Sequence, residues 1–324
     1  MLESSLFILL IALILDWYFG EPEILWSRLP HPVVLFGKAV SWADKRFNVE
    51  TDSKEAKIRK GSIAISLLIG ASLLVAFLFQ WFIDRLWLLG WVVEIFVVFV
   101  LLAQRSLHEH VHAVRNGLHE SGLEGGQKAV SLIVGRDPEL LDQSGVCRAG
   151  IESLAENYSD GVVAPAFWYA VFGLPGIIVY KMINTADSMI AYKNEKYLWF
   201  GRTAAQIDDL ANWLPARFSA LLIAAGSGML EGVASLRNSL ICALRDSGLH
   251  RSPNAGWPEA AMAGGIDIAL GGPRSYAHET VPQAYLNASG DRDLGPEDIE
   301  QALDVFVLAC FSLWAVVFVL MVLF

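Results

Sequence analysis

Long apolar runs, several of them about the length of a membrane helix, limit what this chain can fold into. Runs with few interruptions cover residues 61–83, 86–103 and 305–324, and shorter or interrupted ones cover residues 4–19, 162–183 and 213–230. A helix needs about 20 apolar residues to cross a bilayer, and lipid does not tolerate unpaired backbone. We therefore predict an all-α polytopic membrane protein, a helical bundle that forms one integral membrane domain over residues 1–324.

Two of the apolar runs contain residues that interrupt helices. Residues 162–183 include Pro175, and residues 213–230 include Pro215 and several glycines. Broken helices are tolerated at membrane depth where the freed backbone lines a polar cavity. We expect both runs to be broken or re-entrant, so that the polar segment 184–212 stays on the cytoplasmic side with the other polar loops.

The composition agrees with a membrane protein and excludes some partners. Of 324 residues, 54% are hydrophobic and only 18% are charged, whereas soluble domains contain about a quarter charged residues. The net charge of -10 argues against nucleic acid as a partner, which leaves small molecules and membrane lipid. Cys147, Cys242 and Cys310 are widely spaced and fit no metal or redox pattern, so we expect reduced packing residues.

The basic residues predict an orientation. Residues 16–60 contain eight Lys and Arg, whereas the connection at Asp84 and Arg85 contains one. Short cytoplasmic loops are enriched in Lys and Arg, so the first segment should be cytoplasmic and the second external. The N-terminal run lacks a basic region and a small-residue cleavage site, which favours a retained membrane helix over a signal peptide. We expect a multi-pass protein of the cell (inner or plasma) membrane with an active site that faces the cytoplasm.

Three carboxylates are spaced four residues apart before an apolar run. Glu152, Glu156 and Asp160 would share one face of a regular helix, with Asn157 about 100° away from Glu156. Like charges at this spacing are destabilising unless a cation lies among them. The pattern predicts a bound cation, and the alternative is an ordinary charged face of a cytoplasmic helix.

A second polar cluster ends the interrupted run at residues 162–183. Asn184, Asp187 and Ser188 follow apolar residues at helical spacing. Ionisable groups at membrane depth are costly and mark functional sites. The alternative is an interfacial helix end, at which Asp187 is solvated.

A third cluster follows at residues 208–217. Asp208 or Asp209 aligns with Asn212 on a helix, and Arg217 follows Pro215. Carboxylate and amide oxygens suit Mg²⁺, and an Arg suits a phosphate or a carboxylate. The alternative is a simple ion pair between Asp209 and Arg217.

Two weaker candidates lie in loops. His31 stands between two prolines, which would present its ring at a loop surface. Ser252 and Asn254 lie in a turn-rich stretch that could offer backbone N–H groups to an anion. The sequence contains no P-loop, no G-x-G-x-x-G fingerprint and no G-x-S-x-G elbow, so a nucleotide would be held without these loops.

Taken together and in this order, the polar stretches resemble one family, the membrane-bound adenosylcobinamide-phosphate synthases (CbiB/CobD) of cobalamin biosynthesis. The resemblance rests on D-x-x-x-G-E-P and P-H-P-V in residues 16–33, G-R-D at 135–137, E-S-x-x-E-N-x-x-D-G-V-V-A-P at 152–165, K-x-I-N-T-x-D-S-M at 181–189, D-D-x-x-N-W-x-P-A-R at 208–217 and S-P-N-A-G-W-P-E-A-A-M-A-G at 252–264. With these stretches in the same order, the resemblance extends over nearly the whole chain.

The resemblance implies a C–N ligase that joins an amino-alcohol phosphate, typically aminopropanol phosphate, to the propionate carboxylate of adenosylcobyric acid. ATP is a substrate, Mg²⁺ the cofactor, and the corrinoid the large substrate. The resemblance also suggests association with later membrane enzymes of cobalamin assembly.

The resemblance also implies roles for individual residues. We expect catalytic roles for Glu152, Glu156, Asn157 and Asp160, with Glu156 holding or deprotonating the ammonium group. Metal binding is expected at Asp187, Asp208 and Asp209. Substrate binding is expected at His31, Lys181, Asn184, Ser188, Arg202, Asn212, Arg217, Ser252 and Asn254.

Two other classes of protein remain open from the residues alone. An intramembrane prenyltransferase also uses Asp-rich Mg²⁺ motifs, although only Asp208 and Asp209 are close together here. A transporter subunit would also explain broken helices that carry polar residues. ATP-dependent product formation distinguishes the synthase from both.

Overall fold

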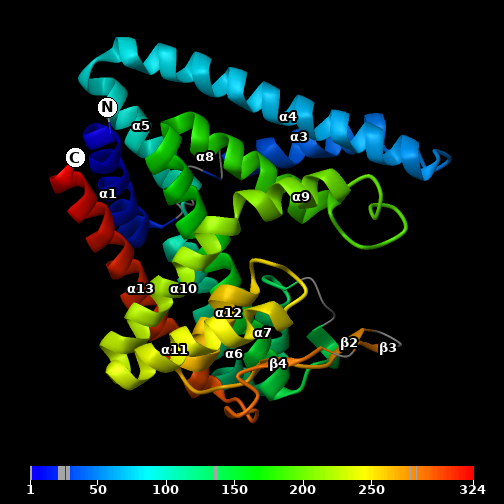
Figure 1. The fold of residues 1–324 in the computed structure, drawn as a ribbon, viewed down its shortest axis with the longest axis vertical. Helices are drawn as coiled ribbons and strands as arrows, with labels where there is room; N and C mark the ends of the chain where they lie inside the picture. Colours follow the sequence, from blue (N-terminus) through cyan, green and yellow to red (C-terminus); the bar gives the residue numbers. More distant parts are fainter. Residues whose placement is uncertain (1, 21–25, 27–29, 135–137, 277–278, 282) are drawn as a thin grey trace. The chain divides into compact units, whose positions relative to one another are not determined.

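The computed structural model describes residues 2–20, 26, 30–134, 138–276, 279–281 and 283–324, and it is almost entirely helical (Figure 1). Among these residues, five helical stretches are long and apolar enough to cross a membrane, and residues 4–19 form a shorter apolar helix. The predicted fold class, an all-α polytopic membrane protein, is therefore confirmed.

The described chain divides into two compact units, each built from separate stretches of sequence. Unit 1 contains residues 1–103, 164–212 and 318–324, and unit 2 contains residues 104–163 and 213–317. The helices of unit 1 are α1 (Leu2–Phe19), α3 (Pro32–Phe47), α4 (Lys54–Ile83), α5 (Leu88–Leu101), α8 (Ala164–Ile190) and α9 (Arg202–Ala211). A 3₁₀ turn, Asp84–Leu86, joins α4 to the start of α5.

Unit 2 contains the remaining long helices and two short β-hairpins. Its helices are α6 (Gln104–Val130), α7 (Gln143–Asn157), α10 (Trp213–Glu231), α11 (Val233–Asp246), α12 (Gly256–Gly265) and most of α13 (Pro296–Leu323). Strand β1 (Leu270–Gly271) pairs antiparallel with β4 (Tyr285–Leu286), and β2 (Arg274–Tyr276) pairs with β3 (Glu279–Val281). Cys147, Cys242 and Cys310 are buried, and none of them forms a disulfide in the described residues.

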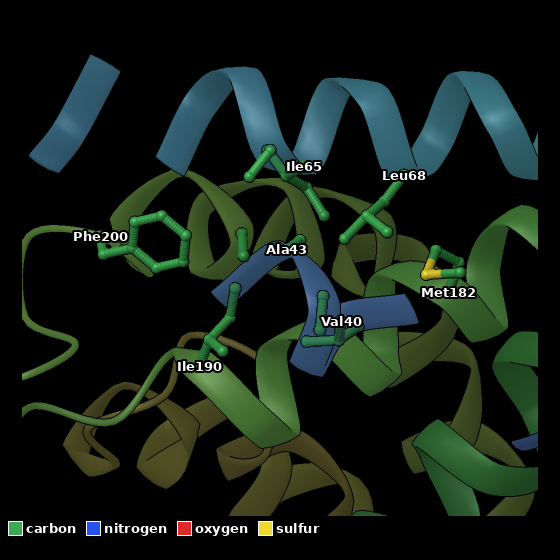
Figure 2. Packing of buried hydrophobic residues seen from close by; sticks show 10 residues of the cluster. Val40, Ala43, Ile65, Leu68, Met182, Ile190 and Phe200 are labelled. Atoms are coloured by element: carbon green, nitrogen blue, oxygen red, sulfur yellow. The ribbon is translucent and has the colours of Figure 1, made fainter. Parts of the chain in front are cut away.

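The core of unit 1 lies where four helices meet. Side chains of α3, α4, α8 and α9 pack into one apolar cluster, and Figure 2 shows Val40, Ile65, Leu68 and Met182 pointing toward one another. Phe200, in the connection between α8 and α9, closes this cluster and is only 1% exposed. This packing fixes α9 against the C-terminal half of α8.

Helix α8 is broken at Gly173 and folds back on itself. Gly173 has φ 64° and ψ -150°, a conformation that favours glycine. In a continuous helix, Trp168 and Gly176 would lie about 12 Å apart along the axis. A Cβ at Gly176 would instead overlap the backbone carbonyl of Trp168. Residues 164–172 and 174–190 are therefore two limbs of a helical hairpin.

Similar turns occur at two glycines of unit 2. Gly122 in α6 has φ 63°, and Gly232 between α10 and α11 has φ 92°. A Cβ at Gly117 would contact the carbonyl of Gly125, and one at Gly228 would contact Leu236. Small residues on the facing surfaces allow the two limbs of each hairpin to pack closely.

The structure corrects two of the predicted segments. Helix α10 runs unbroken from Trp213 to Glu231, because Pro215 lies in the first turn, where proline removes no helical hydrogen bond. Helix α4 begins at Lys54, capped by the Ser53 hydroxyl, so the helix starts before the predicted apolar run at residue 61 and includes the basic residues from Lys54 to Lys60. Whether residues 162–183 and 213–230 re-enter the membrane, and whether the two units act as one domain, stay predictions.

The connection between α8 and α9 packs against the basic beginning of α4. The Lys54 ammonium lies 3.9 Å from the centre of the Trp199 ring. The hydroxyls of Ser62 and Thr203 lie 2.7 Å apart. A Cβ at Gly61 would overlap the backbone of Phe200. The polar segment after α8 therefore lies beside the basic end of α4.

Candidate functional site

Three carboxylates and two side-chain amides lie together where α8 and α9 of unit 1 meet. We define the carboxylate cluster as Asn184 and Asp187 of α8 with Asp208, Asp209 and Asn212 at the end of α9. The Asn212 side-chain N–H donates to Asp208 Oδ2 at 2.9 Å, and the charge of Asp187 acts on Asp208. Two stretches that the sequence presents separately thus form one cluster.

Asp208 is the most constrained member of the cluster. It is 8% exposed, and its second oxygen, Oδ1, is buried and makes no hydrogen bond of regular geometry, although the Asn184 side chain is near enough to oppose the rise in the pKa of this carboxyl group. Burial, together with the negative charge of Asp187, raises the pKa of Asp208 to about 7. Burial also raises the pKa of Asp209, and nearby Lys193 opposes that shift.

This arrangement fits a hard cation with few protein ligands. Within the described ranges, no three His, Cys, Asp or Glu side chains gather as a complete metal site. Mg²⁺ is usually bound by one or two carboxylates, with water and substrate phosphates supplying the other oxygens. Asp208, with Asp187 or Asp209 beside it, matches that pattern, and its buried Oδ1 has the character of a ligand atom.

The other predicted residues of unit 1 lie in different settings. Lys181 is buried on α8, whereas Ser188 and Arg202 are exposed. His31 begins α3: its Nδ1 accepts from the backbone N–H of Val33, and its ring packs edge-on against Trp26. His31 therefore caps a helix.

In unit 2, the three carboxylates at four-residue spacing do not share one regular helix. Helix α7 ends at Asn157, and residues Tyr158–Val163 form a π-helical turn that contains Asp160. Glu152 and Glu156 lie in the regular helix, whereas Asp160 lies in the π turn, so the expectation of one regular helix for all three is wrong. Their environments differ as well: Glu152 is buried, Glu156 is exposed, and Asp160 is half-buried.

The buried member of this set has a structural partner. Glu152 Oε1 accepts from the backbone N–H of Gly271 at 2.7 Å, which holds the β1 segment against α7. The Asn157 amide donates to the backbone carbonyl and the hydroxyl of Ser153. Glu156 is thus the exposed carboxylate at the end of α7.

Arg217 and the predicted anion loop also lie in unit 2. The Arg217 guanidinium stacks between two indoles, 4.2 Å from the centre of Trp213 and 4.7 Å from that of Trp257. The Ser252 hydroxyl accepts from the backbone N–H groups of Asn254 and Ala255, so it stabilises the turn before α12. Asn254 is buried in the same turn.

Sequence reasoning missed a buried pair beside that turn. His250 Nε2 lies 3.6 Å from Glu259 Oε1, and the two side chains are 8% and 1% exposed. A Glu in α12, among Ala and Gly, was the signal that could have revealed this pair.

Two parts of the motifs that carry the resemblance, the G-R-D stretch at 135–137 and residues 21–22, lie outside the described residues.

The fold and the carboxylate cluster define a polytopic α-helical membrane protein with ionisable groups at the ends of broken helices. A family model described as "CobD/Cbib protein" matches residues 9–306. The chain belongs to this family and takes part in cobalamin biosynthesis.

Relatives in several bacteria support the assignment. "Cobalamin biosynthesis protein CobD" of a Sinorhizobium species is 53% identical, over 96% of each chain. The protein of the same name from Rhizobium meliloti is 52% identical, over 96% of this chain and 95% of its own. One from Rhodobacter capsulatus is 41% identical, over 92% of this chain and 91% of its own. No solved structure shows significant similarity to this chain.

Proposed function

We propose that this protein is an adenosylcobinamide-phosphate synthase, a C–N ligase. It would join an amino-alcohol phosphate, such as aminopropanol phosphate, to the propionate carboxylate of adenosylcobyric acid at the expense of ATP. Family membership supports the pathway. The observation that supports ATP- and Mg²⁺-dependent chemistry is Asp208, a buried carboxylate beside a second acidic residue, with one oxygen that makes no hydrogen bond of regular geometry.

The reaction needs two steps. The γ-phosphoryl group of ATP moves to a propionate oxygen, which gives an acyl phosphate and ADP. The amine nitrogen then attacks the acyl carbon, the carbon–oxygen bond to phosphate breaks, and inorganic phosphate leaves. A base must first take a proton from the ammonium form of the amine.

We assign parts of this chemistry to residues by their settings. Asp208, with Asp187 or Asp209 beside it, would hold Mg²⁺, which would neutralise phosphate oxygens of ATP when bound. Glu156, exposed at the end of α7, would hold the ammonium group or remove its proton. Arg217 would contact a phosphate or carboxylate of a substrate through the guanidinium N–H groups that do not donate to the backbone carbonyl of Trp213.

The proposal is tested with membranes that contain the protein, adenosylcobyric acid, ATP, Mg²⁺ and aminopropanol phosphate. The amide product should form, as measured by mass spectrometry, and its formation should require both ATP and Mg²⁺. Membranes from cells that lack the protein are the control. Corrinoid uptake without ATP-dependent product would instead favour a transporter.

A second test separates the two steps. Glu156→Gln keeps the shape of the side chain and removes its charge, and loss of a positioned base typically reduces a rate by roughly 10²- to 10⁴-fold. Amide formation should fall by that factor, while corrinoid-dependent release of ADP from ATP persists. If ADP release is lost too, Glu156 acts in carboxylate activation and the base lies elsewhere.

We also propose that the protein lies in the cell membrane with its active site toward the cytoplasm, where ATP is available. The basic residues of segment 16–60 support this orientation. Association with later membrane enzymes of cobalamin assembly would allow a membrane-bound corrinoid to pass on directly.

A further inference from the structure

A buried tyrosine outside every predicted site contacts the carboxylate cluster through one amide group. We propose that Tyr180 is a positioning residue for cation binding: its hydroxyl fixes the Asn212 amide, and this amide fixes the Asp208 carboxylate. The inference rests on the proposed metal role of Asp208. It also changes the role of Asn212, from a substrate contact to an orienting group.

Two hydrogen bonds in series carry the inference. The Tyr180 hydroxyl donates to Asn212 Oδ1 at 2.9 Å. The Asn212 Nδ2 then donates to Asp208 Oδ2 at 2.9 Å. Both bonds are buried, because Tyr180 and Asn212 are 1% exposed and Asp208 is 8% exposed.

The donor and acceptor atoms of the Asn212 amide determine which end faces Tyr180 and which end faces Asp208. An Asn side chain has one acceptor oxygen and one donor nitrogen, and a carboxylate can only accept. A hydroxyl donor on one side and a carboxylate acceptor on the other therefore select a single orientation of Asn212. In that orientation Oδ2 of Asp208 is occupied, and Oδ1 is the oxygen left for a cation.

The surroundings hold Tyr180 and Asn212 in place. The ring of Tyr180 packs with Ala164, Ala211 and Trp168, and the Trp168 indole N–H donates to the backbone carbonyl of Ala211 at 3.1 Å. Tyr180 also lines an apolar pocket of about 560 Å³ between α4, α8 and α9. Water has little access to the hydroxyl from this side, so a lost partner of Asn212 is not easily replaced.

Groups that orient metal ligands typically change metal affinity 10- to 100-fold when they are removed. Tyr180→Phe deletes only the hydroxyl and should raise the apparent Kd for a divalent cation by about tenfold. The matched control is Tyr169→Phe. Tyr169 lies on the same helix and is equally buried, but its hydroxyl donates to Glu94, away from the carboxylate cluster.

The readout is cation binding rather than turnover. Purified protein in detergent is titrated with Mn²⁺, and free Mn²⁺ is followed by electron paramagnetic resonance, with and without a non-hydrolysable ATP analogue. We expect saturable binding to the wild type, a severe loss in Asp208→Asn, about tenfold weaker binding in Tyr180→Phe, and no change in Tyr169→Phe.

A double-variant cycle tests whether Tyr180 acts through Asn212. Adding Tyr180→Phe to Asn212→Ala should weaken Mn²⁺ binding no further, because the acceptor is already gone. Additive losses, or equal losses in Tyr180→Phe and Tyr169→Phe, would overturn the proposal.

The remaining outcomes separate this inference from the proposed function. If Asp208→Asn loses Mn²⁺ but Tyr180→Phe binds normally, the positioning role is wrong and the metal site stands. If Asp208→Asn binds Mn²⁺ like the wild type, or the wild type binds none, the metal site fails and the positioning role fails with it.

Discussion

At Asp208, burial and a neighbouring negative charge act in the same direction, and both oppose ionisation. The carboxyl group is 8% exposed, and its pKa is raised from 3.8 to about 7. A soluble loop would relieve this cost by exposing the group to water. A buried carboxylate at a helix end in a membrane protein suits a cation site, because a bound cation offsets the free-energy cost of ionising the buried group.

Asp208→Asn should therefore change the pH dependence of stability. Between about pH 4 and pH 7, the folded state keeps a proton that the unfolded state loses, so this group destabilises the fold increasingly as pH rises. The full cost at pH 8 is about 2–4 kcal/mol. In EDTA, the variant should be as stable as the wild type near pH 4 and more stable at pH 8, by thermal unfolding in detergent. A difference that stays constant with pH would contradict this.

In unit 2, the pKa of Asp246 is lowered, whereas that of Asp208 in unit 1 is raised. Hydrogen bonds from Arg245 lower its pKa, and the same carboxylate accepts from the backbone N–H of Asn287 at 2.8 Å. Asn287 has φ 48°, and its side-chain N–H lies within hydrogen-bond distance of the carbonyls of Ala263 and Ile268. Asp246 thus anchors the segment that follows the β2–β3 hairpin.

Asp246→Asn should destabilise the fold by about 1–3 kcal/mol at pH 7, because charge-assisted bonds at a buried acceptor are weakened. The lowered pKa means that the carboxylate stabilises the fold above the unfolded-state value, 3.8, and loses this effect as pH falls through the folded-state value. The difference in melting temperature between wild type and variant should therefore shrink at acid pH. An unchanged difference at pH 3 would show that packing, not charge, is responsible.

At the scale of elements, glycine determines where a helix folds back. Gly70 and Gly176 both lie in apolar helices, yet a Cβ at Gly70 would meet nothing within 4 Å, whereas one at Gly176 would overlap the Trp168 carbonyl. The first glycine faces open space on α4. The second allows the two limbs of α8 to touch.

Gly176→Ala should therefore separate the limbs and destabilise the fold by about 1–3 kcal/mol or more, as overpacking does. Gly70→Ala is the control. It should be neutral or stabilising by up to about 1 kcal/mol, since Ala is the better helix former. Thermal unfolding of both variants in the same detergent checks the difference, and equal effects would contradict a hairpin held by close contact at Gly176.

These elements show what the sequence could and could not predict. Hydropathy located α4, α5 and α13, because a run of about 20 apolar residues is enough to predict a membrane helix. It could not distinguish Gly70 from Gly176, since the difference depends on which backbone comes near. Nor could it show that Asp187 and Asp208 meet, because folding brings them together. Regular spacing misplaced Asp160, because a π turn leaves no clear sign in the sequence.

At the scale of the molecule, contacts within unit 1 support the proposed orientation in the membrane. The segment after α8 packs on the basic start of α4 through Lys54 and Trp199. Lys196 also pairs with Asp44 near the end of α3 at 3.1 Å. Because short basic segments stay in the cytoplasm, this contact favours a cytoplasmic position for the whole α8–α9 connection, with α8 entering the membrane and returning.

Cysteine labelling in intact cells tests this arrangement. Ser53 and Asn194 are exposed on the expected cytoplasmic side, and Trp87, 81% exposed, follows the turn expected outside. The wild type is a low-background control, because its three cysteines are buried. An impermeant thiol reagent should label Trp87→Cys in intact cells, but label Ser53→Cys and Asn194→Cys only after the membrane is opened. Labelling of position 194 from outside would mean that α8 crosses completely, and would place the α8–α9 connection on the side of the membrane that lacks ATP.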